Sequence, residues 1–232
     1  TEKDLIANLR KKLEELNNYQ FSDTEWDDFF KNAVANPNEH IVEKTRKIQE
    51  DNVQVLTRDD GSSKNITLID KKNIHNNRLQ VINQYKVNAA TGIREGSLGC
   101  VIGTENGAKH DNRYDVTVLV NGLPLVHIEL KRRGVAIREA FNQINRYQRD
   151  SFWAGCGLYE YIQIFVISNG TNTKYYSNST RRNAEKEHEK RGASKTKTSN
   201  SFEFTCFWAD ANNRVIPDLM ILQRLFSQSI RF

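Results

Sequence analysis

Apolar residues at helical spacing predict three helices at the start of the chain. Positions three and four residues apart lie on one face of a helix and form a stripe that packs against a core. A first helix is predicted over 4–16, and the sequence Ser-Asp-Thr-Glu at 22–25 is a capping box that starts a second. Asn36-Pro37 ends that helix, and a third is predicted over 39–49. The stripe of the first helix consists of Leu5, Leu9, Leu13 and Leu16.

Short apolar or alternating runs predict the strands. Runs of about four to eight residues bounded by Gly, Asn or Pro are typical of strands. They occur at 53–57, 66–69, 79–85, 161–168, 173–177 and 202–208, with a loop over 88–112 and a terminal helix over 219–226. Strands interspersed with helices predict an α/β fold, with a central mixed β-sheet flanked by helices.

The segment 112–131 is the most informative part of the chain. It reads NRYDVTVLVNGLPLVHIELK, in which two apolar strands surround Asn121-Gly122, a strong hairpin signal. Pro124 favours a loop longer than two residues, because proline cannot donate to a ladder. With a loop of about three residues, Asp115 would face Glu129 across the hairpin.

Glu129 and Lys131 are two residues apart and therefore share one face of the second strand, together with His127. Two carboxylates and an ammonium group on one side of a hairpin suit metal-dependent cleavage of a phosphodiester. Mg²⁺ prefers oxygen ligands and keeps several waters, so Asp115 and Glu129 could bind it, with a carbonyl near Leu130 as a third ligand. The ion would polarise a phosphoryl oxygen and acidify a bound water.

Lys131 would orient that water or offset the charge that develops in the transition state. Mn²⁺ could replace Mg²⁺ at such ligands. The alternative is an exposed hairpin with a surface salt bridge between Glu129 and Lys131, and these residues alone leave both interpretations open. For His127, a histidine on the sheet surface that is hydrogen-bonded to a neighbour is favoured over a role at the site.

Residues 134–150 predict a helix that follows the hairpin. Gln143 and Tyr147 are four residues apart, so both point the same way and could lie beside the carboxylates. Alternatively, Tyr147 belongs to the core and Gln143 to the helix surface. The apolar stripe of this helix consists of Ala136, Ala140, Ile144 and Tyr147.

The order of these motifs, Asp115, then Glu129-Leu130-Lys131, then Gln143-x-x-x-Tyr147, resembles the PD-(D/E)xK nuclease superfamily in its Q-x-x-x-Y branch. The segment 112–147 is similar to the nuclease core of the restriction (R) subunit of type I restriction-modification enzymes. Further similar phrases are SDTEW at 22–26, VEKTRK at 42–47, LIDKKN at 68–73 and IQIFVISNGTNTKY at 162–175. The resemblance covers about residues 1–218.

The resemblance implies a role for each matching residue. Asp115 and Glu129 match the metal ligands, and Lys131 matches the catalytic lysine. Gln143 and Tyr147 match the accessory motif, which helps to place DNA or couples cleavage to translocation.

The chain departs from the family pattern at two points. Tyr114 stands where the superfamily has its nominal proline, which this branch tolerates. The opening sequence TEKDLIANLRKKLEELN resembles a later helix of the family, so an acidic N-terminal helix is expected to be missing. Neither Glu2 nor Glu14 is assigned to its role.

The resemblance implies an endonuclease domain over 1–218 with its core at 112–177, followed by an unassigned helix or tail at 219–232. The expected reaction is Mg²⁺-dependent hydrolysis of double-stranded DNA after translocation by motor domains of the full subunit, which use ATP that this chain does not bind. Modification and specificity subunits are the expected partners. Two alternatives stay open: a stand-alone repair-type nuclease, and a non-catalytic DNA-binding or assembly module of the same fold.

Composition narrows these possibilities. The 232 residues are enough for a sizeable core, and they contain no phosphate-loop motif, no G-x-S-x-G motif and no apolar run of about 18 residues. Neither an ATP motor nor a membrane span is therefore expected. Cys100, Cys156 and Cys206 lack C-x-x-C spacing, which argues against a zinc site or a disulfide framework and favours the cytoplasm.

Positive charge gathers in two places. Of the net charge of +5, the segment 181–197 carries +4, from seven Lys or Arg and three Glu. It is predicted to be a solvated loop that could order on DNA or on a partner. Arg132 and Arg133 follow the catalytic lysine directly, and we expect them to bind DNA phosphates without reading sequence.

Overall fold

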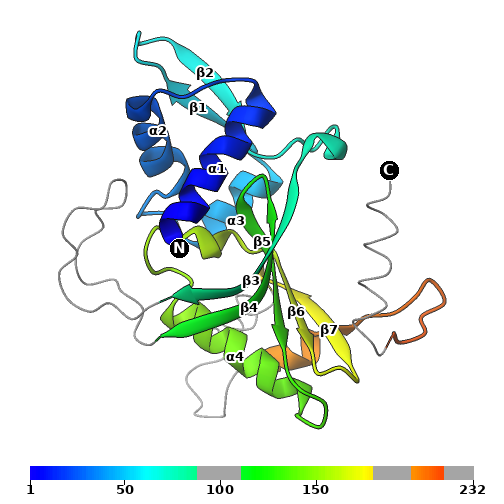
Figure 1. Cartoon of the computed structure of the whole chain (residues 1–232). Helices are drawn as coiled ribbons and strands as arrows, with labels where there is room; N and C mark the ends of the chain where they lie inside the picture. Colours follow the sequence, from blue (N-terminus) through cyan, green and yellow to red (C-terminus); the bar gives the residue numbers. More distant parts are fainter. Residues whose placement is uncertain (88–110, 180–199, 217–232) are drawn as a thin grey trace, which may run out of the picture. The chain divides into compact units, whose positions relative to one another are not determined.

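The computed structural model describes residues 1–87, 111–179 and 200–216 (Figure 1). Its larger sheet has six strands in the order β3-β4-β5-β6-β7-β8, and β1 and β2 form a separate hairpin. The predicted α/β class with a central mixed sheet is confirmed. The chain divides into two compact units, one of 1–126 and 146–162, the other of 127–145 and 163–232. Residues 88–110 of the loop predicted at 88–112, the basic segment 181–197 and the tail 219–232 lie outside the described residues.

The first unit begins with the three predicted helices, α1 (Glu2–Asn17), α2 (Asp23–Phe29) and α3 (Ile41–Gln49). Leu5, Leu9 and Leu13 are buried, as the stripe predicted. The capping box is confirmed, since Ser22 Oγ accepts from the Glu25 N–H at 3.0 Å and Glu25 accepts from the Ser22 N–H at 3.1 Å. The second helix ends as a π-helical turn, η1 (Phe30–Val34), in which the Ala35 N–H donates to the Phe30 carbonyl.

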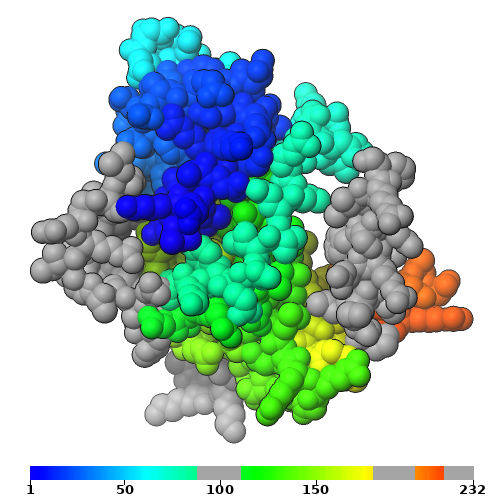
Figure 2. All heavy atoms as spheres, in the orientation of Figure 1, coloured from blue at the N-terminus to red at the C-terminus, as the bar shows by residue number. Residues whose placement is uncertain are grey.

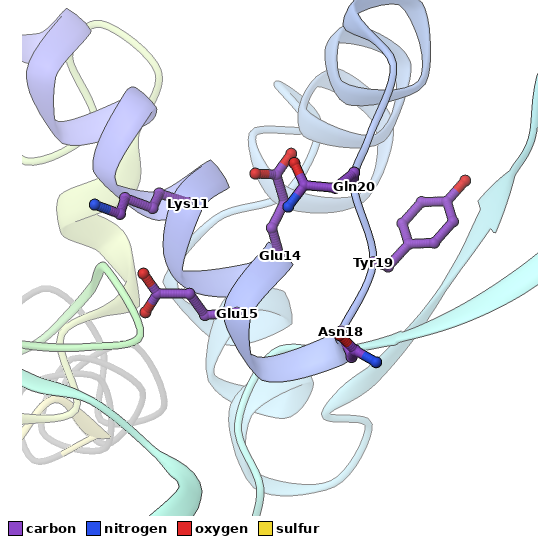
Figure 3. A pocket seen from close by; sticks show the side chains of 6 residues that line it. All are labelled: Lys11, Glu14, Glu15, Asn18, Tyr19 and Gln20. Atoms are coloured by element: carbon purple, nitrogen blue, oxygen red, sulfur yellow. The ribbon is translucent and has the colours of Figure 1, made fainter.

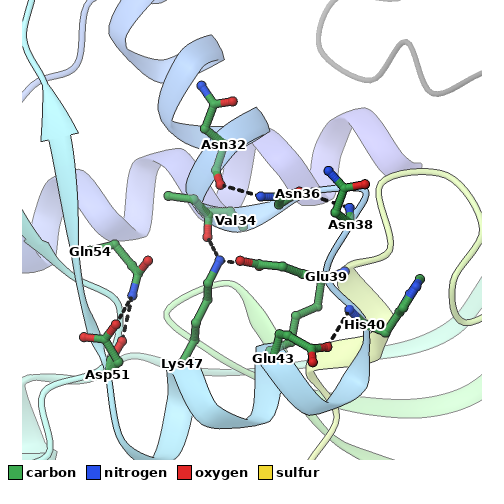
Figure 4. A network of polar contacts seen from close by, with 12 residues as sticks. Asn32, Val34, Asn36, Asn38, Glu39, His40, Glu43, Lys47, Asp51 and Gln54 are labelled. Atoms are coloured by element: carbon green, nitrogen blue, oxygen red, sulfur yellow. Dashed lines mark hydrogen bonds and ion pairs between the residues drawn. The ribbon is translucent and has the colours of Figure 1, made fainter.

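Two lysine side chains of α3 bind acceptors outside the helix. Lys47 donates to the carboxylate of Glu39 (Figure 4) and to the Ala33 carbonyl in η1. Lys44 donates at 2.9 Å to Glu160 and to the Gly157 carbonyl, although its side chain is only 2% exposed. A buried ammonium group needs such acceptors because it loses its hydration. The stretch 42–47, one of the phrases that resemble the restriction-subunit family, therefore has a structural role in the first unit.

The strands β1 (Val53–Thr57), β2 (Ser63–Thr67), β3 (Leu79–Val87) and β4 (Asn112–Val120) complete this part of the chain. β1 pairs with β2, and β3 with β4, both antiparallel. The prediction for β1 is confirmed at both ends. The predicted second strand was placed three residues too late, because Ser63-Lys-Asn are polar but pair with β1.

The loop between β4 and β5 (Leu123–Leu130) has two residues, so the predicted longer loop is wrong. Asn121 and Gly122 both have positive φ, 50° and 86°, as a type I′ turn requires. Pro124 lies inside β5, one residue beyond the pair that flanks the turn. In such a hairpin this next residue donates no hydrogen bond to the partner strand, so proline costs nothing there. Asp115 was expected to face Glu129 only with a loop of about three residues, so the two-residue loop removes the basis for that pairing.

The helix α4 (Ile137–Asp150) begins three residues later than predicted. Gly134 has φ 87°, a left-handed conformation that no right-handed helix contains, and the Val135 N–H closes a turn on the Arg132 carbonyl. Ala136 is exposed and precedes the helix, so it is not part of the apolar stripe, whereas Ala140, Ile144 and Tyr147 are buried as predicted.

In the second unit, β6 (Ile164–Ser168) pairs antiparallel with β7 (Thr173–Ser177), whose predicted bounds are confirmed. The predicted strand at 161–168 begins late, because η3 (Leu158–Tyr161) is a 3-10 helix. The predicted strand at 202–208 is reduced to β8 (Cys206–Phe207) after the 3-10 helix η4 (Asn200–Phe204). α4 packs on β7 through Phe141 and Tyr176, whose ring centroids are 5.1 Å apart. Within the described part of the chain, no helix is long and apolar enough to cross a membrane.

Candidate functional site

Glu129 is fully buried near the end of β5 and forms an ion pair with Lys131. Lys131 Nζ lies 2.9 Å from Glu129 Oε1, and the two side chains are 21% and 0% exposed. The hairpin therefore does not carry the exposed surface salt bridge that was the alternative to a site. Leu130, on the opposite face of the strand, is 37% exposed. The polar face of this strand end, rather than its apolar face, is turned into the protein.

His127 shares the buried face with Glu129. Its side chain is 0% exposed, and its Nε2 lies 3.4 Å from Glu129 Oε2. The favoured prediction of a surface histidine is therefore wrong. It failed because the alternation of β5 shows which residues share a face, but not which face is covered.

Gln143 joins α4 to this strand end. Lys131 donates a hydrogen bond to the Gln143 side-chain oxygen as well as to Glu129. Gln143 is half-buried, so it is not the helix-surface residue of the alternative interpretation. A neutral amide oxygen holds the ammonium group in place without competing for its charge. Of the predicted site residues in the second unit, the structure brings Glu129, Lys131 and Gln143 together.

The backbone after β5 is fastened to the turn that follows β6. The Lys131 N–H donates to the Ser168 carbonyl at 2.8 Å, and Asn169 Nδ2 donates to the Val135 carbonyl at 2.7 Å. Arg132 and Arg133 lie between these two ties and are exposed. The two arginines therefore stand on a loop that is held at both ends.

Asp115 lies on β4 in the first unit and is half-buried. The side-chain amide of Gln84, on the neighbouring strand β3, donates to Asp115 Oδ1 at 3.3 Å. No sequence motif indicates this contact, because Gln84 lies far from every motif. Its φ of 55° is also unusual within a strand and cannot be read from composition.

Tyr147 belongs to the core, as the alternative interpretation had it. It is 2% exposed, its hydroxyl donates to the Arg113 carbonyl at 3.0 Å, and its ring lies 4.8 Å from that of Tyr114. Tyr114 in turn shares a 2.7 Å hydrogen bond with Ser151, and burial raises the pKa of its phenol above the usual range. Tyr147 therefore holds the start of β4, two residues before Asp115.

The donor set suits a hard divalent cation. Glu129 Oε2 is buried and accepts no hydrogen bond from the described residues, so it retains lone pairs for a ligand. The described residues contain no group of three or more His, Cys, Asp or Glu side chains that could hold a metal by themselves. An ion bound by carboxylates that keeps several waters, as Mg²⁺ does, is compatible with this set, whereas a zinc site with four protein ligands is not.

The acidic residues of α1 have structural partners. Glu2 accepts from the Cys156 N–H at 2.8 Å, and Glu14 accepts from the Phe21 N–H at 3.1 Å and from Arg10 at 3.2 Å. A hollow of about 430 Å³ near the end of α1 includes Glu14 (Figure 3). Its other lining residues are also polar, and none of the predicted site residues lines it.

The chain is similar in sequence to a family of known proteins. Residues 1–184 match the model of the type I restriction enzyme R protein N terminus. The chain is 44% identical over 226 residues, 97% of its length, to the type I restriction enzyme EcoprrI endonuclease subunit of Escherichia coli, and spans 61% of that protein. It is also 43% identical over 123 residues, 53% of its length, to the SauMSSORF170P endonuclease subunit of Staphylococcus aureus, and covers 11% of it. For the SsaAORF53P endonuclease subunit of Staphylococcus saprophyticus, the identity is 36% over 182 residues, 76% of this chain and 17% of that subunit. The chain belongs to the family of type I restriction enzyme R protein N termini.

Proposed function

We propose that this chain is the endonuclease domain of a type I restriction subunit and hydrolyses phosphodiester bonds of double-stranded DNA with Mg²⁺. The observation that carries the proposal is the buried carboxylate of Glu129, paired with Lys131 and retaining an oxygen that accepts no hydrogen bond from the described residues. Burying a carboxylate is costly, so a bare structural role would favour an apolar residue at this position.

Asp115 and Glu129 would hold the metal ion. The ion would polarise a phosphoryl oxygen and acidify a bound water. Lys131 would stabilise the negative charge that develops on the phosphate, with its ammonium group oriented by Gln143. Tyr147 would act indirectly, by holding the start of β4. Arg132 and Arg133 would bind phosphates of the DNA backbone without reading its sequence.

The relatives are named as endonuclease subunits and are longer than this chain, which supports a role within a larger subunit and complex. We propose that ATP-driven motor domains of the same subunit move DNA towards this domain. The specificity subunit, joined with the modification subunit in the complex, would choose the target, and cleavage would follow translocation. Dependence on ATP and on these subunits distinguishes the proposal from a stand-alone repair-type nuclease, which would cut DNA without them.

Calorimetric titration of the chain with Mn²⁺ tests the metal site without the motor domains. We expect saturable binding in the parent and its loss in both Asp115→Asn and Glu129→Gln. Glu139→Gln serves as the matched control, because Glu139 is an exposed acid in the first turn of α4. Equal heats in the parent and in both site variants, all folded by circular dichroism, would refute the metal site and favour a non-catalytic assembly module.

A further inference from the structure

The ladder between β3 and β4 is interrupted at one position. Every residue of β3 from Leu79 to Val87 has a register partner on β4 except Gln84, and the β4 residue at the opposite position is Asp115. Gln84 has φ 55°, in the left-handed region that a residue other than glycine or asparagine rarely adopts in a strand. Such strained residues persist where the surrounding structure holds them and gather at functional sites.

The interruption changes which face of β4 each side chain takes. In a regular strand, residues three apart point to opposite faces. Tyr114 and Thr117 nevertheless both contact Tyr159, at 4.6 Å between ring centroids and 3.4 Å between hydroxyl oxygens. The alternation is therefore reset between these two residues, at Asp115 and Val116.

This reset determines the surroundings of the Asp115 carboxylate. By regular alternation from Thr117 and Leu119, which are 1% and 2% exposed, Asp115 would also point to the buried side of β4. There it would lie among aromatic rings, where an ionised carboxylate is strongly disfavoured. Asp115 is instead half-buried, and the Gln84 amide donates to its Oδ1.

The chemistry of the contact suits a metal ligand. A side-chain amide is a neutral donor, so it can orient a carboxylate without offsetting the negative charge that attracts a cation. A lysine or arginine in its place would reduce that attraction. Strand β3 lies at the surface of the molecule (Figure 2), and the Gln84 side chain is exposed. Packing of the Gln84 side chain therefore does not account for its conformation.

We propose that Gln84 is the positioning residue for Asp115. Its left-handed backbone turns the Asp115 carboxylate out of the buried face of β4, and its amide fixes the orientation of Oδ1. The purpose of this arrangement rests on the proposed function, in which Asp115 binds the metal. The contact itself does not, and the two can be tested separately.

The first test uses the metal-free protein. The side-chain NH₂ resonances of Gln84 are assigned by heteronuclear NMR in the parent and in Asp115→Asn. We expect them to shift in the variant, while those of Gln80, whose amide donates to Asn8 instead, stay in place. Unchanged Gln84 resonances would overturn the proposal, whether or not the protein binds a metal.

The second test is Mn²⁺ titration of variants at this position. Valine disfavours positive φ, so Gln84→Val is expected to weaken binding by about 10-fold or more, as loss of a residue that orients a metal ligand does. Gln84→Gly keeps the backbone and loses only the amide, so it should bind between the parent and Gln84→Val. Asn83→Val is the control, since Asn83 is exposed on the same strand and pairs regularly with Val116.

Parent-like binding by both Gln84 variants would overturn the positioning role. Gln84→Gly keeps the test decisive if the valine variant does not fold, because glycine adopts positive φ freely. If the parent itself binds no Mn²⁺ while the Gln84 resonances respond to Asp115→Asn, the metal site of the proposed function fails and the orientation of Asp115 by Gln84 stands.

Discussion

Lys131 and Glu129 form an ion pair 2.9 Å long in which the glutamate side chain is fully buried and the lysine side chain is 21% exposed. The two residues are separated by one position, so the strand itself sets their spacing. Lys131 has a second acceptor on α4, in Gln143. The ammonium group is thereby held at one place, whereas a surface lysine would sample many rotamers. The lysine offsets the charge of the buried carboxylate, so removing the lysine leaves that charge uncompensated.

Removing the cation should therefore destabilise the fold. Breaking a fully buried pair costs about 3–5 kcal/mol, and for Lys131→Met we expect about 2 kcal/mol, because the lysine side chain is 21% exposed. Adding Glu129→Gln should restore part of the loss, because no uncompensated charge then remains. Urea denaturation of the two single variants and the double variant gives the coupling energy, and Arg132→Met is the exposed control. Additive effects of the two substitutions would contradict the pairing.

The tight turn of the β4–β5 hairpin yields a sharper prediction about packing. A Cβ at Gly122 would lie 2.6 Å from the Leu9 Cα atom, and the residue has φ 86°. Gly122→Ala should therefore cost more than about 3 kcal/mol, because α1 must move. Gly61 has a similar φ of 81° but no atom within 4 Å of its Cβ position, so Gly61→Ala should cost only about 1 kcal/mol. Equal thermal shifts for the two variants would show that α1 does not rest on this turn.

Sequence patterns predicted the bounds of an element correctly where residues adjacent in the sequence determine them. The bounds of β1 and β7 are set by polar and glycine-containing turns at their ends, and the capping box at 22–25 starts α2 as expected. Errors arose where a neighbouring residue decides the outcome. The missing N–H of Pro124 favours a longer loop, but next to a two-residue turn the loss of that donor is harmless.

The candidate site shows the same division. The motif residues and their shared face could be named from spacing, since alternation places Glu129 beside His127 and Lys131. Spacing does not determine which face is buried, and so the surface position expected for His127 was wrong. Gln84 was missed altogether, because its contact with Asp115 depends on strand pairing and on a backbone conformation for which glutamine has no preference.

The buried lysine of α3 provides a test of structural electrostatics outside the candidate site. Lys44 is 2% exposed and donates to Glu160 and to the Gly157 carbonyl. Lys44→Met leaves Glu160, which is 13% exposed, without this partner, and we expect a loss of about 3 kcal/mol in unfolding free energy. Lys12→Met removes the more exposed pair with Glu15 and should leave the denaturation midpoint near that of the parent. A small effect of Lys44→Met would mean that solvent reaches Glu160 freely.

Buried tyrosines should make the first unit sensitive to alkali. Burial raises the pKa values of Tyr114, Tyr159 and Tyr161 above that of a free phenol, which is about 10. Between these values the unfolded chain releases protons that the folded chain keeps, so the stabilisation is complete below about pH 10 and falls as the pH rises further. The unfolding free energy, measured in urea at pH 8 to 11, should therefore decrease above pH 10, together with a rise in tyrosinate absorbance on unfolding.

Tyr161→Phe separates this titration from the hydrogen bond that the same residue makes. The Tyr161 hydroxyl donates to the Val34 carbonyl at 2.8 Å in a buried setting, so its loss should cost about 1–2 kcal/mol at pH 8. The variant also lacks one of the raised pKa values, so its stability should fall less steeply than that of the parent above pH 10. The two unfolding curves should therefore converge as the pH rises. Parallel curves would show that Tyr161 ionises in the folded protein as readily as in the unfolded chain, and that its burial is relieved by local opening.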